Sequence, residues 1–303
     1  MSGPIETGDV QRMQEMIDAI PMQDHDDLNF LLCLDSKGGS LAEGLALGEI
    51  VHKQFMGTYV PRGAECLSAC AVIFMHGRVS YWETFVDFRV LHPGGVLGFH
   101  APSLGLKMSP TDEVPGALVN AAYTAAMQNV SKLVENAATT VSATSRPIIP
   151  LSLLKDMLAT PSDSFVYADT LHKTFRWQID IMPHDLSAPE GFDLKVGYTQ
   201  MCENMSYVLH PQTAPLDAPT QVTAKDVEFY ETTYHATQPD VPKGHSLVKM
   251  GEMFEEQCTF VYNKKGDYFE VTYYVEGRPQ GLRYLDSVFL FAPSTSLREI
   301  AGK

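Results

Sequence analysis

The chain is poor in basic residues. Its 303 residues include 22 Lys and Arg against 37 Asp and Glu, which gives a formal net charge of -15. Nucleic acid and anionic membrane surfaces are themselves negative, so an acidic protein surface repels both. We therefore expect no nucleic acid and no anionic membrane among the partners of this protein.

Long hydrophobic runs are also missing. No stretch reaches the roughly 18 consecutive apolar residues that a membrane-spanning helix needs, so we expect no membrane span. Residues 1–6 contain neither the basic nor the apolar region of a signal peptide. Two interpretations stay open: the protein is cytoplasmic, or a signal peptide has been removed from an exported protein.

Cysteine is scarce, with five in the chain. An odd number leaves at least one thiol unpaired within a monomer. No Cys-x-x-Cys pair and no group of histidines has the spacing of metal ligands, so we expect no metal and no other cofactor.

Four of the cysteines form two pairs of interest. Cys66 and Cys70 flank Ser68, and three roles are open to them: buried packing, a redox-sensitive pair, or a disulfide. Residues four apart fit a disulfide poorly inside a regular helix, so we expect buried packing. Cys202 and Cys258 lie further along the chain and are candidates for a disulfide, with free thiols as the alternative.

The first part of the chain alternates between helical and strand-like segments. Residues 9–20 and 41–54 have apolar residues at helical spacing, and 28–34 and 58–60 have the composition of buried strands. This alternation predicts a layered α/β fold. We expect a further short strand at 96–100 and a long Ala-rich helix at 115–140, with Leu118 and Leu133 among the residues of its buried face.

The character of the chain changes near residue 185. Prolines become frequent, and strand-like runs follow at 259–262, 268–275 and 287–291. We therefore expect two domains, an α/β domain over 1–184 and a linker with a small C-terminal β-rich (α+β) module over 185–303.

Three motifs lie at predicted strand ends in the first domain. Gly38 and Gly39 follow the strand at 28–34, Ser68 follows the strand at 58–60 within a stretch of small residues, and His100 ends the strand at 96–100. Ligands of α/β folds bind at the carboxyl ends of strands, so the glycine turn and Ser68 can share one cleft. The plainer interpretations are a helix cap for Ser68 and an ordinary polar strand end for His100.

These motifs resemble the Clp-protease/crotonase superfamily. The resemblance lies in Asp35-Ser36-Lys37-Gly38-Gly39-Ser40-Leu41, then Ser68-Ala69, then Gly98-Phe99-His100-Ala101-Pro102, and it covers roughly residues 2–182. The chain looks most like the bacterial predicted periplasmic Clp-protease-like proteins. The resemblance implies a core of stacked ββα units in two roughly perpendicular sheets, a periplasmic or otherwise exported location, and homo-oligomers formed through the helix after the histidine.

The resemblance also implies a role for each matching residue. Ser68 takes the position of the nucleophile, His100 that of the general base, and Asp163 that of the carboxylate that orients the histidine. The backbone N–H groups of Gly39 and Ala69, with Gly38 in the same turn, would form the oxyanion hole. This set predicts a serine hydrolase that acts as a peptidase on a peptide or protein substrate, because a serine hydroxyl needs a base to become nucleophilic.

Several alternatives remain open at this point. Lys37 replaces the proline common in the glycine turn of the family and is most simply a solvated loop lysine. Asp163 is equally well a turn residue, with Asp156 and Asp169 as nearby rivals, and a Ser-His dyad is an alternative to a triad. The whole core can also be a catalytically inactive scaffold that binds peptide or protein, or an acyl-CoA-binding enzyme of the crotonase type.

Overall fold

The computed structural model describes residues 1–20, 30–81, 84–102, 115–141, 146–182, 194–209, 246–250, 256–263, 268–275, 278–285 and 287–302. Contacts between Cα atoms divide the chain into a first unit, Met1–Asp169, and a second unit, Thr170–Lys303. The sequence placed the boundary later, after residue 184. Thr170 already belongs to the second unit because it bridges Ser296, and the next two backbone N–H groups donate to carbonyls of residues 295 and 293.

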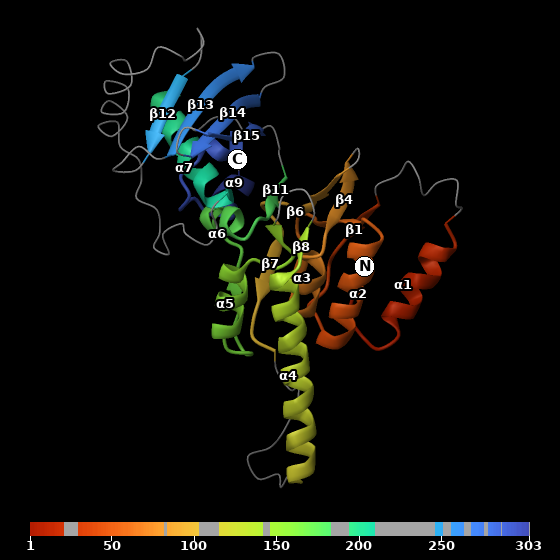
Figure 1. Ribbon diagram of the computed structural model, residues 1–303. Coiled ribbons are helices and arrows are strands. Elements are labelled where there is room, and N and C mark those ends of the chain that lie inside the picture. Colours follow the sequence, from red (N-terminus) through yellow and green to blue (C-terminus); the bar gives the residue numbers. More distant parts are fainter. Residues whose placement is uncertain are drawn as a thin grey trace. The chain divides into compact units, whose positions relative to one another are not determined.

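The first unit alternates helices and short strands (Figure 1). Its elements are α1 (Asp9–Asp18), β1 (Leu31–Cys33), α2 (Leu41–Lys53), β2 (Gly57–Val60), β3 (Glu65–Leu67), α3 (Ala69–Phe74), β4 (Arg78–Tyr81), β5 (Thr84–Asp87), β6 (Arg89–Leu91), β7 (Val96–Phe99), α4 (Gly116–Ala138), β8 (Thr140–Val141), β9 (Arg146–Pro147), α5 (Leu151–Ala159) and β10 (Val166–Tyr167).

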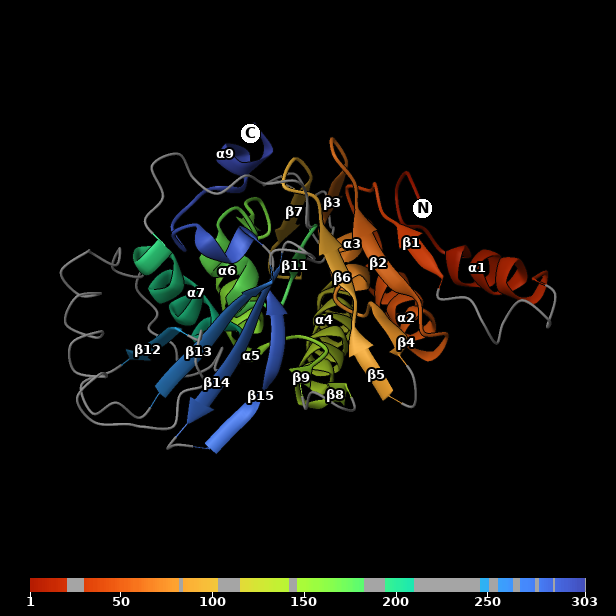
Figure 2. The same ribbon diagram turned by 90° about the horizontal axis from the view of Figure 1, so that it is seen from above.

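Two small sheets organise this unit. In the first, β1, β2 and β6 pair in parallel, and they lie side by side in Figure 2. In the second, β3 pairs in parallel with β7, and β10 adds to β7 in the antiparallel sense. The mixed α/β class with parallel strands that the sequence predicted is confirmed. Strand β3, within the serine stretch, is an element that the sequence did not indicate.

The chain passes from the first sheet to the second directly after β1. Leu34 donates its backbone N–H to the Tyr59 carbonyl beside β2, and Ser36 then exchanges backbone hydrogen bonds with Glu65 and Leu67 at distances of 2.7 and 3.0 Å. This switch brings the residues that follow β1 against β3. The glycine turn and the end of β3 are therefore neighbours in space.

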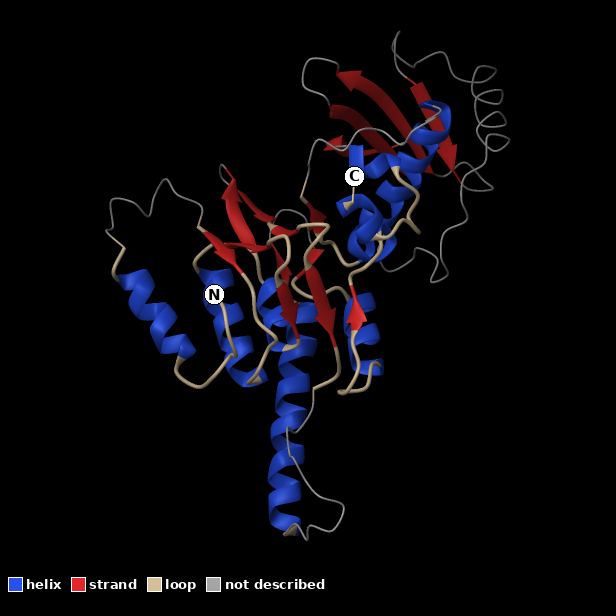
Figure 3. Ribbon diagram, turned by 180° about the vertical axis from the view of Figure 1, so that it is seen from behind, coloured by secondary structure: helices blue, strands red, loops and turns tan. Residues whose placement is uncertain are grey.

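The core between the helices and sheets is apolar and tightly packed. Figure 3 shows the strands of the first unit grouped together, with helices outside them. All six residues of α3 are buried. Other fully buried side chains of this unit are Leu34, Leu47, Val51, Val60 and Leu91. Burial of such side chains is the main source of folding free energy, at about 25 cal/mol per Å² of apolar surface.

Helix α2 packs on α3 through glycines. A Cβ added to Gly44 would lie 3.0 Å from Ala69, and one added to Gly48 would lie 2.5 Å from the His76 ring just after α3. Glycine at both positions therefore allows the two helices to approach closely. Ser40 caps α2 by accepting from the Glu43 backbone N–H.

Helix α4 extends away from the strands of the first unit (Figure 1), and its only buried residue is Leu133. The sequence predicted that Leu118 would also be on a buried face, but Leu118 is 50% exposed. The apolar side chains of α4 that this unit leaves exposed are Leu118, Val119, Tyr123, Met127 and Val134.

The second unit combines helices with an antiparallel sheet. Its elements are α6 (Leu171–Arg176), β11 (Asp180–Ile181), α7 (Leu194–Leu209), β12 (Ser246–Met250), β13 (Glu256–Asn263), β14 (Tyr268–Val275), β15 (Arg278–Leu285), η3 (Ser287–Leu290) and α9 (Leu297–Ala301). Strands β12 to β15 pair in chain order. A disulfide joins Cys202 of α7 to Cys258 of β13, both completely buried. None of the helices in the described ranges is both long and apolar enough to cross a membrane.

A buried histidine makes the stability of the first unit depend on pH. His76 is 2% exposed, its Nδ1 lies 2.8 Å from the Val72 carbonyl oxygen, and its Nε2 lies 3.1 Å from the Asn136 amide nitrogen. A carbonyl only accepts, so Nδ1 carries the proton and Nε2 accepts from Asn136. Burial disfavours the imidazolium form and lowers the pKa of His76 from 6.5 to about 4.

We predict that the free energy of unfolding falls as the pH is lowered from 6.5 to 4. The unfolded chain binds a proton at His76 in this range and the folded chain does not, so the full stabilisation is present above pH 6.5 and is lost toward pH 4. A lowering from 6.5 to about 4 corresponds to roughly 3 kcal/mol. Urea unfolding at several pH values measures this slope, and His76→Gln should flatten it. Equal slopes in both proteins would contradict the prediction. Part of the slope should remain in the variant, because burial also lowers the pKa of His52 to about 4.

Candidate active site

Ser68 occupies the sharp turn between β3 and α3. Its backbone has φ 57° and ψ -123°, a region that residues other than glycine seldom adopt. Such a conformation costs on the order of 1–3 kcal/mol and is commonly retained at functional sites. The Ser68 N–H donates to the Gly98 carbonyl of β7, which fixes the turn against the neighbouring strand.

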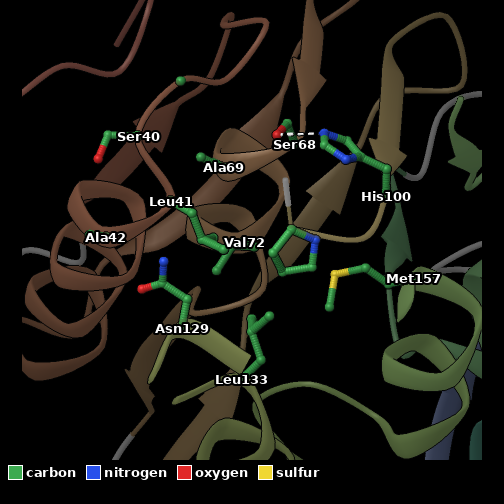
Figure 4. Close-up of a pocket in the computed structure, with 12 residues that line it drawn as sticks. Ser40, Leu41, Ala42, Ser68, Ala69, Val72, His100, Asn129, Leu133 and Met157 are labelled. Atoms are coloured by element: carbon green, nitrogen blue, oxygen red, sulfur yellow. Dashed lines mark hydrogen bonds between the residues drawn. The ribbon is translucent and has the colours of Figure 1, made fainter. Parts of the chain in front are cut away.

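The parallel pairing of β3 and β7 brings Ser68 to His100. Leu67, the last residue of β3, is in register with Gly98, and both strands end at the same edge of the sheet. The Ser68 Oγ lies 2.8 Å from the His100 Nε2, as the dashed line in Figure 4 marks. The hydroxyl makes no capping hydrogen bond to α3. The interpretation of Ser68 as a helix cap is therefore wrong.

The second ring nitrogen of His100 fixes the tautomer. Its Nδ1 lies 2.7 Å from the backbone carbonyl oxygen of Ala101, which can only accept, so Nδ1 carries the proton. In the neutral imidazole, Nε2 then carries no proton and accepts a hydrogen bond from the Ser68 hydroxyl. The Phe165 ring meets the imidazole edge-on, with ring centroids 4.9 Å apart. His100 is thus held from two sides in the form that a general base requires.

The glycine turn lies directly against Ser68. Gly38 has φ 92°, and a Cβ added to it would lie 2.7 Å from the Ser68 Cβ and 3.1 Å from the Ala69 backbone nitrogen. Gly39 has φ 154°, and a Cβ there would lie 2.2 Å from the Ile5 carbonyl oxygen. Only glycine satisfies both constraints at these two positions.

Two backbone N–H groups beside Ser68 are available to a ligand. Among the described residues, the N–H groups of Gly39 and Ala69 have no hydrogen-bond acceptor. The Gly39 side of the turn is fixed by Ile5, which donates to the Gly38 carbonyl and accepts from the Ser40 N–H at 3.0 and 2.9 Å. A pair of preorganised, unpaired N–H groups near a nucleophile can stabilise an oxyanion.

A pocket with a volume of about 280 Å³ opens beside Ser68 and His100 (Figure 4). The wall combines apolar side chains from helices α2, α3, α4 and α5 with polar groups, Ser40 and Asn129 among them. The lining residues are Gly39, Ser40, Leu41, Ala42, Ser68, Ala69, Val72, His100, Pro102, Asn129, Leu133 and Met157. The volume is close to the lower limit for small-molecule sites, about 300 Å³, and is large enough for one amino-acid side chain.

The two cysteines beside Ser68 form a disulfide. Cys66 and Cys70 are bonded and completely buried. The sequence predicted buried packing without a bond, on the grounds that residues four apart fit poorly within a helix. That reasoning fails because Cys66 lies in β3, Cys70 lies in α3, and the chain reverses between them at Ser68. Cys33 is the free cysteine, and it is exposed.

The remaining predicted residues lie apart from this cluster. Asp163 is exposed, and within the described chain no hydrogen bond or ion pair joins it to His100. Lys37 points to Glu65, with its Nζ 3.5 Å from the carboxylate, and is 83% exposed. The structure thus brings together Ser68, His100, the glycine turn and Ala69, and it does not bring the Asp163 carboxylate to them.

Sequence reasoning missed the group that orients His100. The acceptor is the Ala101 backbone carbonyl, which no side-chain motif can reveal. A signal was nevertheless present, because Pro102 biases the preceding residue toward extended backbone and so restricts where the Ala101 carbonyl can point. Phe165 lies within the quoted Asp163-Ser164-Phe165 segment, and it is this aromatic ring that contacts the histidine.

No group of His, Cys, Asp and Glu side chains in the described ranges has the arrangement of a metal site.

Comparison with known proteins gives a distant likeness in structure and none in sequence. No protein-family model matches the chain, and no curated protein matches it. Among solved structures, the chain is similar to a serine-to-alanine mutant of the 1510-N membrane-bound stomatin-specific protease. The identity is 14%, the TM-score is 0.37, and the match covers 60% of this chain and 75% of that one. Because the likeness is so distant, a function has to be inferred from the geometry of the site itself.

We predict that Gly38→Ala is more damaging than Gly63→Ala. Both glycines have positive φ, 92° and 79°, so alanine costs about 1 kcal/mol at either position from backbone strain. A Cβ at Gly63 meets nothing within 4 Å, whereas one at Gly38 meets the Leu67 carbonyl oxygen and the Ser68 Cβ at 2.7 Å. The overlap should add roughly 1–3 kcal/mol. Urea unfolding measures the difference, and equal losses would show that the turn does not press on the nucleophile.

Proposed function

We propose that this protein is a serine hydrolase that acts as a peptidase. The observation that carries the proposal is the 2.8 Å contact between Ser68 Oγ and His100 Nε2, made at a strained turn beside two unpaired backbone N–H groups. A helix-capping or merely structural serine needs neither the strain nor the histidine. The protease-type fold of the distant structural relative is compatible with this function and adds no detail to it.

The site supports a two-step acyl transfer. His100 Nε2 takes the Ser68 hydroxyl proton while Oγ forms a bond to the substrate carbonyl carbon, and the carbonyl oxygen becomes an oxyanion bound by the N–H groups of Gly39 and Ala69. The imidazolium then gives its proton to the leaving amine as the C–N bond breaks. Water attacks the acyl-enzyme with His100 again as base, which releases the acid and restores the Ser68 hydroxyl.

A Ser-His dyad supported by a backbone carbonyl is the arrangement we propose. The Ala101 carbonyl, 2.7 Å from Nδ1, fixes the tautomer as an aspartate would. A neutral carbonyl stabilises the imidazolium less than a carboxylate does, because it carries no net charge. A dyad of this kind should therefore be a slower catalyst than a triad with the same oxyanion hole.

The pocket wall indicates the kind of substrate. Leu41, Val72, Leu133 and Met157 present apolar surface beside Ser68, and Asn129 and Ser40 supply the polar groups. We propose a peptide or protein substrate whose apolar side chain, next to the cleaved bond, occupies this pocket. Burial of such a side chain provides binding energy of about 1.5–3 kcal/mol.

Labelling with a fluorophosphonate probe tests the proposal. The Ser68 Oγ should displace fluoride and form a stable phosphonyl ester, with His100 accepting the proton. We predict that peptide mapping finds the label on Ser68 and not on Ser40 in the same pocket, that Ser68→Ala abolishes it, and that His100→Ala slows it by about 10²–10⁴-fold. A folded wild-type protein that takes no label would favour the alternative, a catalytically inactive scaffold that binds peptide or protein.

A second substitution separates the dyad from a triad. We predict that Asp163→Asn labels at close to the wild-type rate, because Asp163 is exposed and makes no hydrogen bond to His100. Replacement of the aspartate in an established triad lowers turnover by about 10⁴-fold. The labelling rate of Asp163→Asn could instead fall by nearly that factor while its melting temperature stays unchanged. That result would show that the carboxylate reaches His100 during the reaction, and it would contradict the dyad.

A further inference from the structure

The Cys66–Cys70 disulfide encloses the nucleophile. Cys66 belongs to β3 and Cys70 to α3, and the three residues between them are Leu67, Ser68 and Ala69. These three include the proposed nucleophile and one of the two proposed oxyanion donors. The mechanism above makes no use of the bond, which leaves its position to be explained.

The bond is compatible only with a sharp turn at Ser68. The Cα atoms of Cys66 and Cys70 lie 5.2 Å apart. In an extended strand, residues four apart would lie roughly 13 Å from each other, at about 3.3 Å per residue. Disulfides need Cα atoms closer than about 7 Å, so the bond excludes conformations in which β3 simply continues past Ser68.

The length of the closed loop points to a local role. A disulfide restricts the unfolded chain more when it closes a longer loop. The separation is 4 residues for Cys66–Cys70 and 56 for Cys202–Cys258. The Cys202–Cys258 bond therefore stabilises the folded state as a whole more strongly. The Cys66–Cys70 bond instead lies across one strained residue, Ser68, which has to be held in place.

The other restraints on this turn are hydrogen bonds to its two sides. Ser68 donates to the Gly98 carbonyl at 3.0 Å, and its own carbonyl accepts from the Val72 N–H at 3.3 Å. The disulfide adds a covalent link between the residues before and after the turn. Both half-cystines are completely buried, so the link is shielded from solvent while the protein is folded.

We propose that the Cys66–Cys70 disulfide is a positioning clamp for the nucleophile. It holds the Ser68 Oγ against His100 and keeps the Ala69 N–H directed at the developing oxyanion, so the oxidised protein is the active form. This inference depends on the proposed role of Ser68. Neither cysteine touches the substrate, and their effect passes through the backbone of Ser68 and Ala69.

The clamp makes activity depend on the redox state of this pair. Dithiothreitol reduces it by thiol–disulfide exchange: the two thiols of the reagent give two electrons and two protons, the S–S bond becomes two Cys thiols, and the reagent closes to its cyclic disulfide. The reduced turn loses its covalent restraint and can relax away from the strained conformation.

The test compares two double variants of the full chain. We predict that Cys66→Ala with Cys70→Ala lowers the rate constant of fluorophosphonate labelling at Ser68 by roughly tenfold or more, since small displacements of reacting groups cost about 10²-fold. Turnover of a small ester should show the loss in kcat, with little change in KM because the pocket wall is intact. The control, Cys202→Ala with Cys258→Ala, should label at the wild-type rate below its melting temperature.

Rates are normalised to the folded fraction, so a purely structural role would leave them unchanged. Equal labelling rates in the Cys66/Cys70 variant and wild type would overturn the clamp while leaving the serine hydrolase in place. A wild-type protein that is never labelled at Ser68 would contradict both the clamp and the serine hydrolase.

Partial reduction of the wild-type protein replaces the variant where the variant does not fold. Alkylation and mass spectrometry give the reduced fraction of each cysteine pair, and labelling should fall with reduction of Cys66–Cys70 alone. Labelling that stays constant while this pair is reduced would also overturn the clamp.

Discussion

The parallel pairing of β3 with β7 is the constraint on which the site depends. It sets Leu67 against Gly98 and so places Ser68 and His100, the residues that follow the two strands, at one edge of the sheet. The same pairing supplies the Gly98 carbonyl that receives the Ser68 N–H and holds the strained turn. A shift of this register by one residue would turn the side chains to the opposite faces and separate the two groups.

A second layer of contacts turns this edge into a preorganised site. The segment before α1 runs beside the glycine turn and binds it through Ile5, so the turn cannot move away from Ser68 without breaking two backbone hydrogen bonds. Behind the site, α2 reaches α3 through Gly44 and Gly48, and the buried His76 links α3 to Asn136 of α4. Helices α2 and α4, which form part of the pocket wall, are thereby fixed relative to α3 and Ser68.

Much of this arrangement could be predicted because it follows local rules. Strand ends on parallel strands share an edge, so the sequence predicts that the glycine turn and Ser68 share one cleft, and the family resemblance adds His100 to them. The strand that precedes Ser68 is β3, however, and not the predicted strand at 58–60. Helices α2 and α4 began and ended close to the predicted residues because caps and prolines mark them.

The failures have a different cause, namely contacts distant in sequence. Cys66 and Cys70 were judged within a helix because the three-residue strand β3 is too short to show a period of two. The segment at 287–291 has the composition of a strand, but residues 287–290 form the short helix η3. The Phe289 carbonyl of η3 and the Phe291 carbonyl just after it accept from Asn204 of α7. Leu118 is apolar and at helical spacing, yet α4 extends past the body of its unit and leaves it exposed.

The contrast between Asp163 and Ala101 shows how one site can satisfy a chemical requirement in two ways. A catalytic histidine needs an acceptor at Nδ1 to keep Nε2 free, and both a carboxylate and a carbonyl meet that need. The carboxylate adds charge stabilisation, whereas the carbonyl adds rigidity because it belongs to the residue next to the histidine. Three features restrict the conformation of this site: the strained backbone of Ser68, the glycine turn closed by Ile5, and the disulfide across the turn at Ser68. In the proposed reaction, each would reduce the freedom of the reacting groups, so the proposed dyad would depend on fixed geometry where a triad would also use a buried negative charge.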